Sequence, residues 1–191
     1  QMVALVCALR GSVCLYQGEE LGLPEADVPF EALRDPYGIT FWPNFKGRDG
    51  CRTPMPWTGD ADAGFSTGTP WLPIPDAHRA LSVASQSADA DSVLAQTRRF
   101  LQWRRTQPAL RTGDIVFLDT PEPVLAFIRT AGDTRVLVAF NLSSSPVAWT
   151  LPAGMTPTAL DAHGVPMGTP DATALRLPAH GLYFGALTDA D

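Results

Sequence analysis

The sequence predicts an α+β fold in which a helical and loop-rich part precedes an antiparallel β-sandwich. Apolar residues recur at helical spacing from Val93 to Arg104. From about Gly113 the pattern changes to short β-like runs separated by turn signals, which is typical of a sandwich. The long stretch before the helix shows neither period. We therefore predict two domains, residues 1–112 and residues 113–191.

The first residues predict a buried helix. Residues 1–9 are almost uninterrupted apolar sequence, and Arg10 and Gly11 follow as a cationic last turn and a stop. A helix that is apolar all round needs neighbours on every side. Because the chain also starts within this element, we expect it to be a piece of a longer protein.

A short buried strand is predicted next. Residues 13–16 form an apolar run between two glycines, Gly11 and Gly18. Glu19 and Glu20 follow at its end. In barrels of alternating strands and helices, the active site lies at the C-terminal ends of the strands. The alternative is that both glutamates pair with arginines or cap a helix.

Residues 23–86 are predicted to be a folded loop. The segment carries nine prolines from Pro24 to Pro75, and structureless loops of more than about 12–15 residues are uncommon in compact domains. A disordered linker would be poor in aromatic residues. This segment has eight of them: Phe30, Tyr37, Phe41, Trp42, Phe45, Trp57, Phe65 and Trp71. Aromatic faces beside acidic groups suit sugars; the alternative is that the rings only anchor the loop.

Helix-capping residues, helix-breaking prolines, turn residues and the alternation of apolar and polar residues predict the remaining elements. Asp89 or Asp91 is the predicted N-cap of the long helix, and Pro108 is predicted to end it. A tight hairpin connection is predicted at Ala131–Asp133 and another turn at residues 143–146. The predicted strands are residues 115–118, 124–130, 135–142, 147–151, 174–177 and 182–187.

Composition excludes several classes of function. The net charge of −6 and the pI near 4.9 argue against a nucleic-acid partner, because binding phosphates requires clustered cations. No apolar stretch reaches the roughly 18–20 residues that cross a bilayer. Cys7, Cys14 and Cys51 cannot all pair and lack metal-ligand spacing, so we expect reduced, mostly buried thiols and a cytoplasmic protein. The three histidines lie far apart, and we expect them at the surface or in loops, with no metal site.

Two motifs together resemble one enzyme family. The first is Gly11 together with Gly18-Glu19-Glu20, which follows the apolar run, and the second is Gly47-Arg48-Asp49-Gly50-Cys51-Arg52-Thr53-Pro54-Met55-Pro56-Trp57. They are similar to the α-glucosidase and oligo-1,6-glucosidase branch of the α-amylase superfamily. In that branch the eighth barrel strand ends in Tyr-Gln-Gly-Glu-Glu, and a downstream loop reads Arg-Thr-Pro-Met. The resemblance implies the last strand and helix of a (β/α)8 catalytic barrel, with a long aromatic loop, in residues 1–112. An antiparallel β-sandwich domain then follows in residues 113–191.

The resemblance also implies roles for individual residues. In the similar enzymes the arginine of the Arg-Thr-Pro-Met loop helps to hold the non-reducing glucose, and that role falls on Arg52. A guanidinium suits it because its planar donors bind carboxylates and neighbouring hydroxyls. Arg48 and Asp49 are expected to shape the loop or the acceptor side. Glu19 and Glu20 are expected to brace the site.

No catalytic residue is expected within this chain. Retaining glycoside hydrolysis needs two carboxyl groups about 5–5.5 Å apart. Adjacent residues on an extended strand point to opposite faces, so Glu19 and Glu20 are not that pair. In the resembling family the three catalytic carboxylates follow strands four, five and seven, upstream of the segment matched here. The resemblance therefore implies a retaining hydrolase of short α-glucosides, without cofactor or metal, whose C-terminal portion is inactive alone.

Two alternatives remain open. A sucrose-active or transglycosylating relative would use the same retaining intermediate, whereas a non-catalytic carbohydrate-binding module would bind sugar through the aromatic loop. The expected partners are a small oligosaccharide or α-glucoside and the missing half of the barrel. A second copy of the chain is the other expected partner for the strand at residues 13–16. The sandwich is expected to be the more autonomous half.

Overall fold

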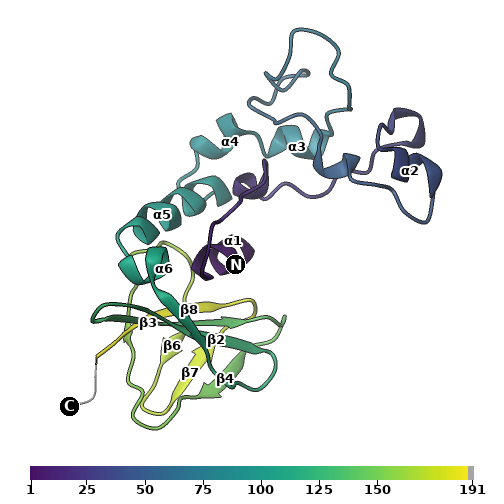
Figure 1. The fold of residues 1–191 in the computed structure, drawn as a ribbon. Coiled ribbons are helices and arrows are strands. Elements are labelled where there is room, and N and C mark those ends of the chain that lie inside the picture. Colours follow the sequence, from purple (N-terminus) through teal and green to yellow (C-terminus); the bar gives the residue numbers. More distant parts are fainter. Residues whose placement is uncertain (189–191) are drawn as a thin grey trace. The chain divides into compact units, whose positions relative to one another are not determined.

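A computed structural model describes residues 1–188, which form two compact units. The sandwich unit combines Gln1–Cys14 with the chain from Arg98 onward, and the loop unit is Leu15–Thr97. All strands belong to the sandwich unit, whereas the loop unit contains only short helical segments, the start of a longer helix and loops (Figure 1). The N-terminal helix therefore belongs with the β-rich part of the sequence.

Two antiparallel sheets form the sandwich unit, which confirms the sandwich expected from the sequence. The strand order is β1-β2-β3-β8-β5 in one sheet and β4-β7-β6 in the other. β2 and β3 form a hairpin at Gly132, whose φ of +56° favours glycine. The strands are β1 (Asp114–Phe117), β2 (Val124–Ala131), β3 (Thr134–Asn141), β4 (Val147–Thr150), β5 (Thr158–Ala159), β6 (Thr169–Pro170), β7 (Ala174–Leu177) and β8 (Leu182–Leu187).

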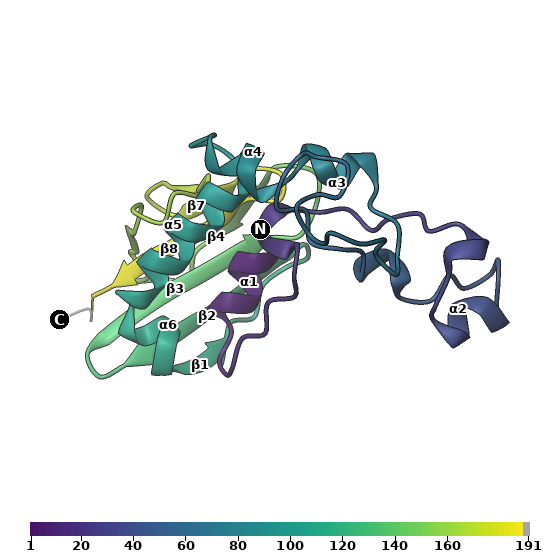
Figure 2. The same cartoon turned by 90° about the horizontal axis from the view of Figure 1, so that it is seen from above.

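Both faces of the five-stranded sheet are covered. One face contributes to a core cluster of Val124, Ala126, Leu137, Ala139, Trp149, Leu175, Leu177, Tyr183 and Leu187. The other face carries α1 (Met2–Ala8), α6 (Pro108–Thr112) and the C-terminal turns of α5 (Val93–Arg105), as Figure 2 shows. There Phe100 and Trp103 meet Phe184 at ring-centroid distances of 5.9 and 5.0 Å. This two-sided burial of apolar area is the main stabilising term of the unit.

The ends of α5 differ from the predicted ones. Ser92, and neither Asp89 nor Asp91, caps the helix, because its Oγ accepts the Ala95 N–H at 3.2 Å. Asp89 instead accepts the Asp91 N–H at 2.8 Å in a local turn. Pro108 does not end α5 directly but begins α6, at a position where the missing N–H costs nothing.

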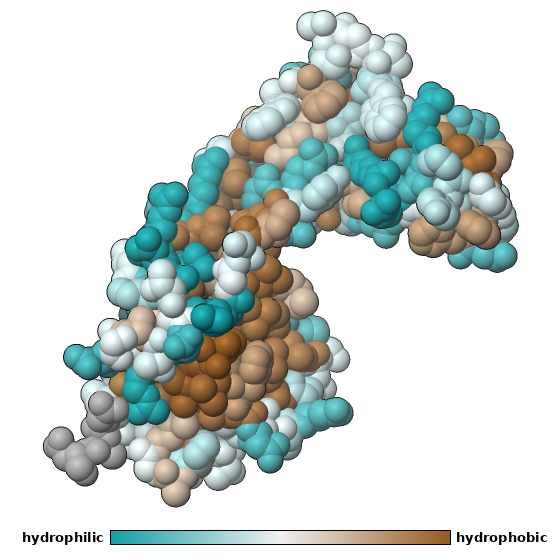
Figure 3. Space-filling view, in the orientation of Figure 1, coloured by the Kyte–Doolittle hydropathy of each residue, from teal (hydrophilic) through white to brown (hydrophobic). Residues whose placement is uncertain are grey.

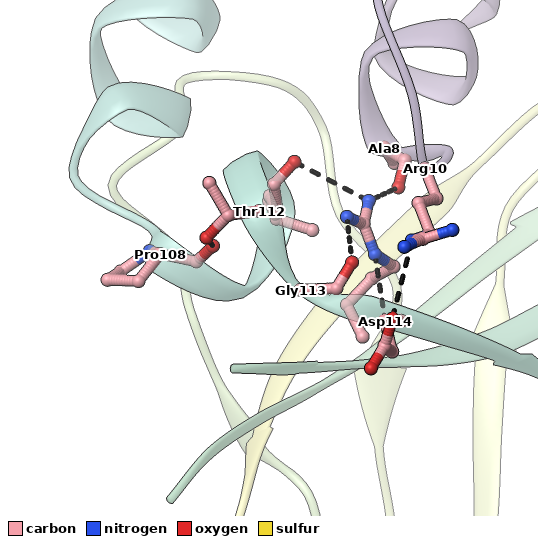
Figure 4. A network of polar contacts seen from close by, with 8 residues as sticks. Ala8, Arg10, Pro108, Thr112, Gly113 and Asp114 are labelled. Carbon is pink, nitrogen blue, oxygen red and sulfur yellow. Dashed lines mark hydrogen bonds and ion pairs between the residues drawn. The ribbon is translucent and has the colours of Figure 1, made fainter. Parts of the chain in front are cut away.

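A buried arginine joins the helices to the sheet. Arg129 of β2 is fully buried, and its guanidinium donates to the backbone carbonyls of Ala8, Leu110, Gly113 and Asp114 (Figure 4). The bonds to Gly113 and Asp114 measure 2.8 and 3.2 Å. Burial lowers the pKa of Arg129, and the charges of Arg104 and Arg10 lower it further, while Asp114 raises it. The side chain thus connects the end of α1 to the segment where α6 passes into β1.

The strand predicted at residues 13–16 is not present. This run has no regular structure, and Cys14 and Tyr16 are exposed. A parallel strand depends on hydrogen bonds to neighbouring strands, and no strand within residues 1–188 pairs with this segment. The helix before it forms as predicted, but Met2 and Val6 are exposed, so it is not buried on every side.

The cysteines also differ from expectation. Cys7 is buried, but Cys14 and Cys51 are exposed, and none of the three forms a disulfide. None of the helices that the structure describes is long and apolar enough to cross a membrane. The same residues contain no group of three or more His, Cys, Asp or Glu side chains that could hold a metal ion.

The loop unit folds around two aliphatic clusters, one of Leu21, Met55 and Leu94 and one of Val28, Leu33 and Leu72. The eight aromatic residues of residues 23–86 are exposed, so burial of their rings is not what holds the loop together. The aliphatic clusters and side-chain hydrogen bonds hold it instead. Its helical segments, besides the first turn of α5, are η1 (Glu19–Leu21), η2 (Phe30–Ala32), α2 (Pro36–Thr40), η3 (Asp49–Cys51), α3 (Asp76–Ala80) and α4 (Val83–Ser87).

His163 is expected to make the sandwich unit less stable in acid. Its ring is fully buried 5.1 Å from the Trp103 ring, and its Nδ1 accepts the Val165 N–H at 3.2 Å, which requires the neutral form. Burial lowers the pKa of His163, and Asp161 opposes the shift. The histidine therefore stabilises the fold above its ordinary pKa of 6.5, and this contribution is lost as the pH falls toward the lowered folded value.

Urea unfolding at about pH 7.5 and about pH 5 measures this loss. His163→Gln keeps a hydrogen-bond acceptor but does not titrate, so its midpoint should fall less in acid. An equal fall in both proteins would contradict the assignment.

Candidate functional site

The two sequence motifs meet at one cavity in the loop unit. Its volume is about 240 Å³, and it is lined by Tyr16, Gln17, Gly18, Glu19, Leu23, Pro24, Glu25, Gly47, Arg48, Gly50, Cys51, Thr53 and His78. The structure therefore brings Glu19 and Arg48 together, although 28 positions separate them in the sequence. It places Glu20, Asp49 and Arg52 outside this wall.

A tight turn carries the two glutamates. Gly18 has a φ of +91°, which favours glycine, and η1 begins directly after it. A carboxylate oxygen of Glu20 accepts the Gly18 N–H at 2.8 Å, so this side chain closes its own turn. Glu19 is exposed and lines the cavity. Of the two, Glu19 is the one placed to meet a ligand.

A histidine that the sequence analysis missed completes the wall. His78 of α3 is 2% exposed, with Nε2 bonded to the Pro24 carbonyl at 2.7 Å and Nδ1 to the Thr53 hydroxyl at 3.1 Å. Because the Pro24 carbonyl can only accept, Nε2 donates the hydrogen in that bond. The expected surface or loop position is wrong for His78, which is buried in helix α3, whereas His163 lies in a turn as expected, although its ring is buried. No periodic pattern around either residue marks it as buried.

Asp49 fixes the loop behind the cavity. Its side chain is fully buried, and Oδ2 accepts the N–H groups of Arg34 and Asp35 at 2.6 and 2.7 Å. The other oxygen, Oδ1, is buried without a hydrogen-bond partner among the residues that the structure describes. Asp49 is thus placed to shape the loop and is shielded from a ligand.

Arg52 lies beside a second buried carboxylate, Asp35. One Asp35 oxygen accepts the Tyr37 N–H at 3.0 Å and so caps α2. The other accepts the Arg48 N–H at 2.9 Å and lies 3.8 Å from Nη1 of Arg52. The pKa of Asp35 is lowered, and the hydrogen bond from the Arg48 N–H is the largest cause. Burial opposes this shift. The hydrogen bond from the Tyr37 N–H and the positive charges of Arg52 and Arg48 add to it. Asp35 therefore stays ionised. Gly47 allows the close approach, since a Cβ there would lie 2.9 Å from Cγ of Asp35.

The cavity wall suits a neutral ligand that carries several hydroxyl groups. Two of its lining residues, Glu19 and Glu25, have carboxylates that can accept hydrogen bonds, and a third, Arg48, has a guanidinium that can donate them. Leu23 and Tyr16 add apolar surface beside these polar groups. A site of this kind binds and orients a ligand through a few polar contacts on an apolar wall.

Two family models match the chain in sequence order. The alpha amylase catalytic domain matches residues 1–113, and the maltogenic amylase C-terminal domain matches residues 115–184. The chain belongs to the alpha-amylase family. This confirms the resemblance inferred from the two motifs. It also places the cavity within the segment that matches the alpha-amylase catalytic domain.

Relatives within the alpha-amylase family are much longer than this chain. A probable alpha-glucosidase of Rhizobium meliloti is 47% identical over 97% of this chain and 33% of its own length. An oligo-1,6-glucosidase of Heyndrickxia coagulans is 31% identical over 75% of this chain and 29% of its own length. The crystal structure of an alpha-glucosyl transfer enzyme, XgtA, is 57% identical with a TM-score of 0.93, covering 97% of this chain and 35% of that one. The chain thus spans about a third of the length of these relatives.

Proposed function

We propose that this chain is the C-terminal third of a retaining hydrolase that acts on short α-glucosides. The observation that carries the proposal is the cavity, where both alpha-amylase motifs contribute polar side chains to one wall. The α-glucosidase relative at 47% identity supports α-glucosides as the substrate class. We place the enzyme in the cytoplasm, since the odd number of cysteines in this chain does not allow all three to pair with one another.

In this proposal the catalytic carboxylates come from a part of the enzyme outside this chain. Glu20 closes its own turn, while Asp35 and Asp49 are buried and bound to backbone N–H groups. None of these three is available as a nucleophile or an acid/base residue. Glu19 alone does not make the pair of carboxyl groups that retention requires.

The missing part is the rest of a (β/α)8 barrel, of which residues 1–112 form the end; residues 113–191 form the sandwich domain. The border between the two family models, at residues 113 and 115, supports this division. Figure 3 shows hydrophobic residues gathered on one face of the sandwich unit, over the region of α1 and strands β2, β3 and β8. Met2, Val116 and Phe117 of this unit are each more than half exposed. Exposed apolar surface of this kind marks an interface, here with the remaining barrel.

Arg52 is the proposed contact to the non-reducing glucose. Its side chain is 34% exposed, so its donors reach solvent and a ligand. Glu19 and Arg48 support the site from the cavity wall. Glu20 and Asp49 support it by accepting hydrogen bonds from backbone N–H groups.

A second candidate function is the transfer of an α-glucosyl group to an alcohol acceptor. The observation that favours it is the 57% identity to a structure described as an alpha-glucosyl transfer enzyme. Both reactions pass through the same covalent glucosyl intermediate, and the acceptor, water or alcohol, separates them.

The test assays the complete enzyme that contains this chain with p-nitrophenyl α-glucoside. Hydrolysis should release p-nitrophenol and glucose in equal amounts, whereas transfer should release more p-nitrophenol than glucose. The chain by itself is expected to release neither. Robust turnover by the purified chain alone, or an inactive complete enzyme with every α-glucoside tried, would overturn the proposal.

A further inference from the structure

We infer that Asp35 is a positioning residue that holds the guanidinium of Arg52 at the place where it binds the sugar. The inference rests on the proposed function, because it takes Arg52 as the side chain that contacts the α-glucoside. Asp35 is itself 5% exposed and does not reach a ligand. Its effect on the reaction passes through Arg52.

The Asp35 carboxylate has a fixed orientation. Backbone N–H groups bind its two oxygens separately, Tyr37 at 3.0 Å and Arg48 at 2.9 Å. Rotation of the carboxylate would break one bond or both, and each is a hydrogen bond to an ionised acceptor. The oxygen bound by Arg48 therefore presents a stationary negative charge to Arg52.

The backbone that carries Asp35 is fixed as well. Asp49 accepts the N–H groups of both Arg34 and Asp35, and this carboxylate is fully buried. On the other side, Gly47 leaves just enough room for the Asp35 side chain. The bonds of Asp35 and Asp49 thus join the two ends of residues 35–48, as in a compact Ω-type loop.

The distance between Asp35 and Arg52 sets the kind of interaction. At 3.8 Å, the Oδ2–Nη1 separation is longer than a hydrogen bond of about 2.7–3.2 Å, so the pair is held by charge alone. Among the described residues, none accepts a hydrogen bond from the Arg52 side chain. The charge of Asp35 therefore holds the Arg52 guanidinium at this place, while its N–H donors remain available for sugar hydroxyls.

A double-mutant cycle in the complete enzyme tests this inference. Asp35→Asn keeps the size of the side chain and one oxygen for the cap of α2, but it removes the charge and turns an N–H group toward Arg48 and Arg52. Arg52→Ala removes the proposed sugar contact. Each single variant is expected to raise KM for p-nitrophenyl α-glucoside by about 10-fold or more, with little change in kcat, because a contact made equally in ground and transition states affects KM. The double variant should be no worse than Arg52→Ala.

A matched control comes from the same loop. The ion pair between Lys46 and Asp27 lies at the surface and touches neither Asp35 nor Arg52. Asp27→Asn should leave kcat and KM unchanged. Asp35→Ser, which also keeps a helix cap, should repeat the KM effect of Asp35→Asn and serves if that variant does not fold.

The outcomes separate the inference from the proposed function. An unchanged KM in Asp35→Asn and Asp35→Ser, with a raised KM in Arg52→Ala, overturns the inference alone. Additive effects in the double variant also overturn it, because Asp35 would then act independently of Arg52. A normal KM in Arg52→Ala overturns the role of Arg52 itself. A complete enzyme without activity on α-glucosides overturns the proposed function.

Discussion

Replacement of Arg129 by methionine is expected to lower the free energy of unfolding of the sandwich unit by roughly 3–5 kcal/mol. The guanidinium is fully buried and donates to four carbonyls. Arg104 also donates to one of these, Leu110 O, at 3.1 Å, so methionine removes the guanidinium donor from the other three. A buried carbonyl without a donor costs about 1–3 kcal/mol, and the apolar methionine side chain recovers only part of this through burial.

Arg129→Lys is the matched control. Lysine keeps the positive charge but concentrates its three donors at one point, whereas the planar guanidinium reaches carbonyls on several sides. We expect Arg129→Lys to lose about half as much stability as Arg129→Met. Hydrogen exchange of β2 and β3 peptides in increasing urea measures both losses. A loss below about 1 kcal/mol in Arg129→Met would show that water or backbone relaxation satisfies these carbonyls.

Arg129 also shows what the sequence leaves undetermined. The strand that contains it was predicted from its apolar and β-branched residues, and this prediction is confirmed by β2. An arginine in such a pattern is normally assigned to the solvent face. It is buried here because carbonyls near residues 8, 110 and 113 converge on it, and only the tertiary fold brings those segments together.

Elements with strong local signals were predictable, and elements that depend on distant partners were not. α5 and the longer strands follow from periodicity. β5 and β6 were missed because two residues carry no alternation. The strand predicted at residues 13–16 was wrong because an apolar run forms a strand only beside another strand.

The residues of the candidate site were likewise predictable only in part. The two motifs predicted that Glu19 and Arg48 belong to one site, and they line one cavity. Their proposed roles, and that of Arg52, stay predictions. Asp35 was missed even though Asp-Pro is a typical start of a helix, because its partners Arg48 and Arg52 lie 13 and 17 positions further along the chain.

Gly50→Ala is expected to destabilise the loop unit by roughly 3 kcal/mol, the upper end of the cost of overpacking. Gly50 is buried within the second motif, and a Cβ there would lie 2.4 Å from the Ala26 carbonyl oxygen and 2.7 Å from Cγ of Glu25. The Ala26 N–H also donates to the Gly50 carbonyl at 3.0 Å, so the two backbones cannot separate without breaking this bond. Hydrogen exchange of peptides from residues 26–52 in increasing urea measures the loss.

Gly68→Ala provides the control within the same unit. Gly68 is exposed, and its added Cβ would meet no atom closer than 3.9 Å, so its stability should change by less than about 0.5 kcal/mol. Equal effects of the two substitutions would mean that the close approach at Gly50 relaxes without cost. The expected difference implies that Gly50 serves packing: it lets residues 48–52 lie against residues 25–26, and this contact holds Arg48 in the cavity wall and Asp49 beneath Asp35.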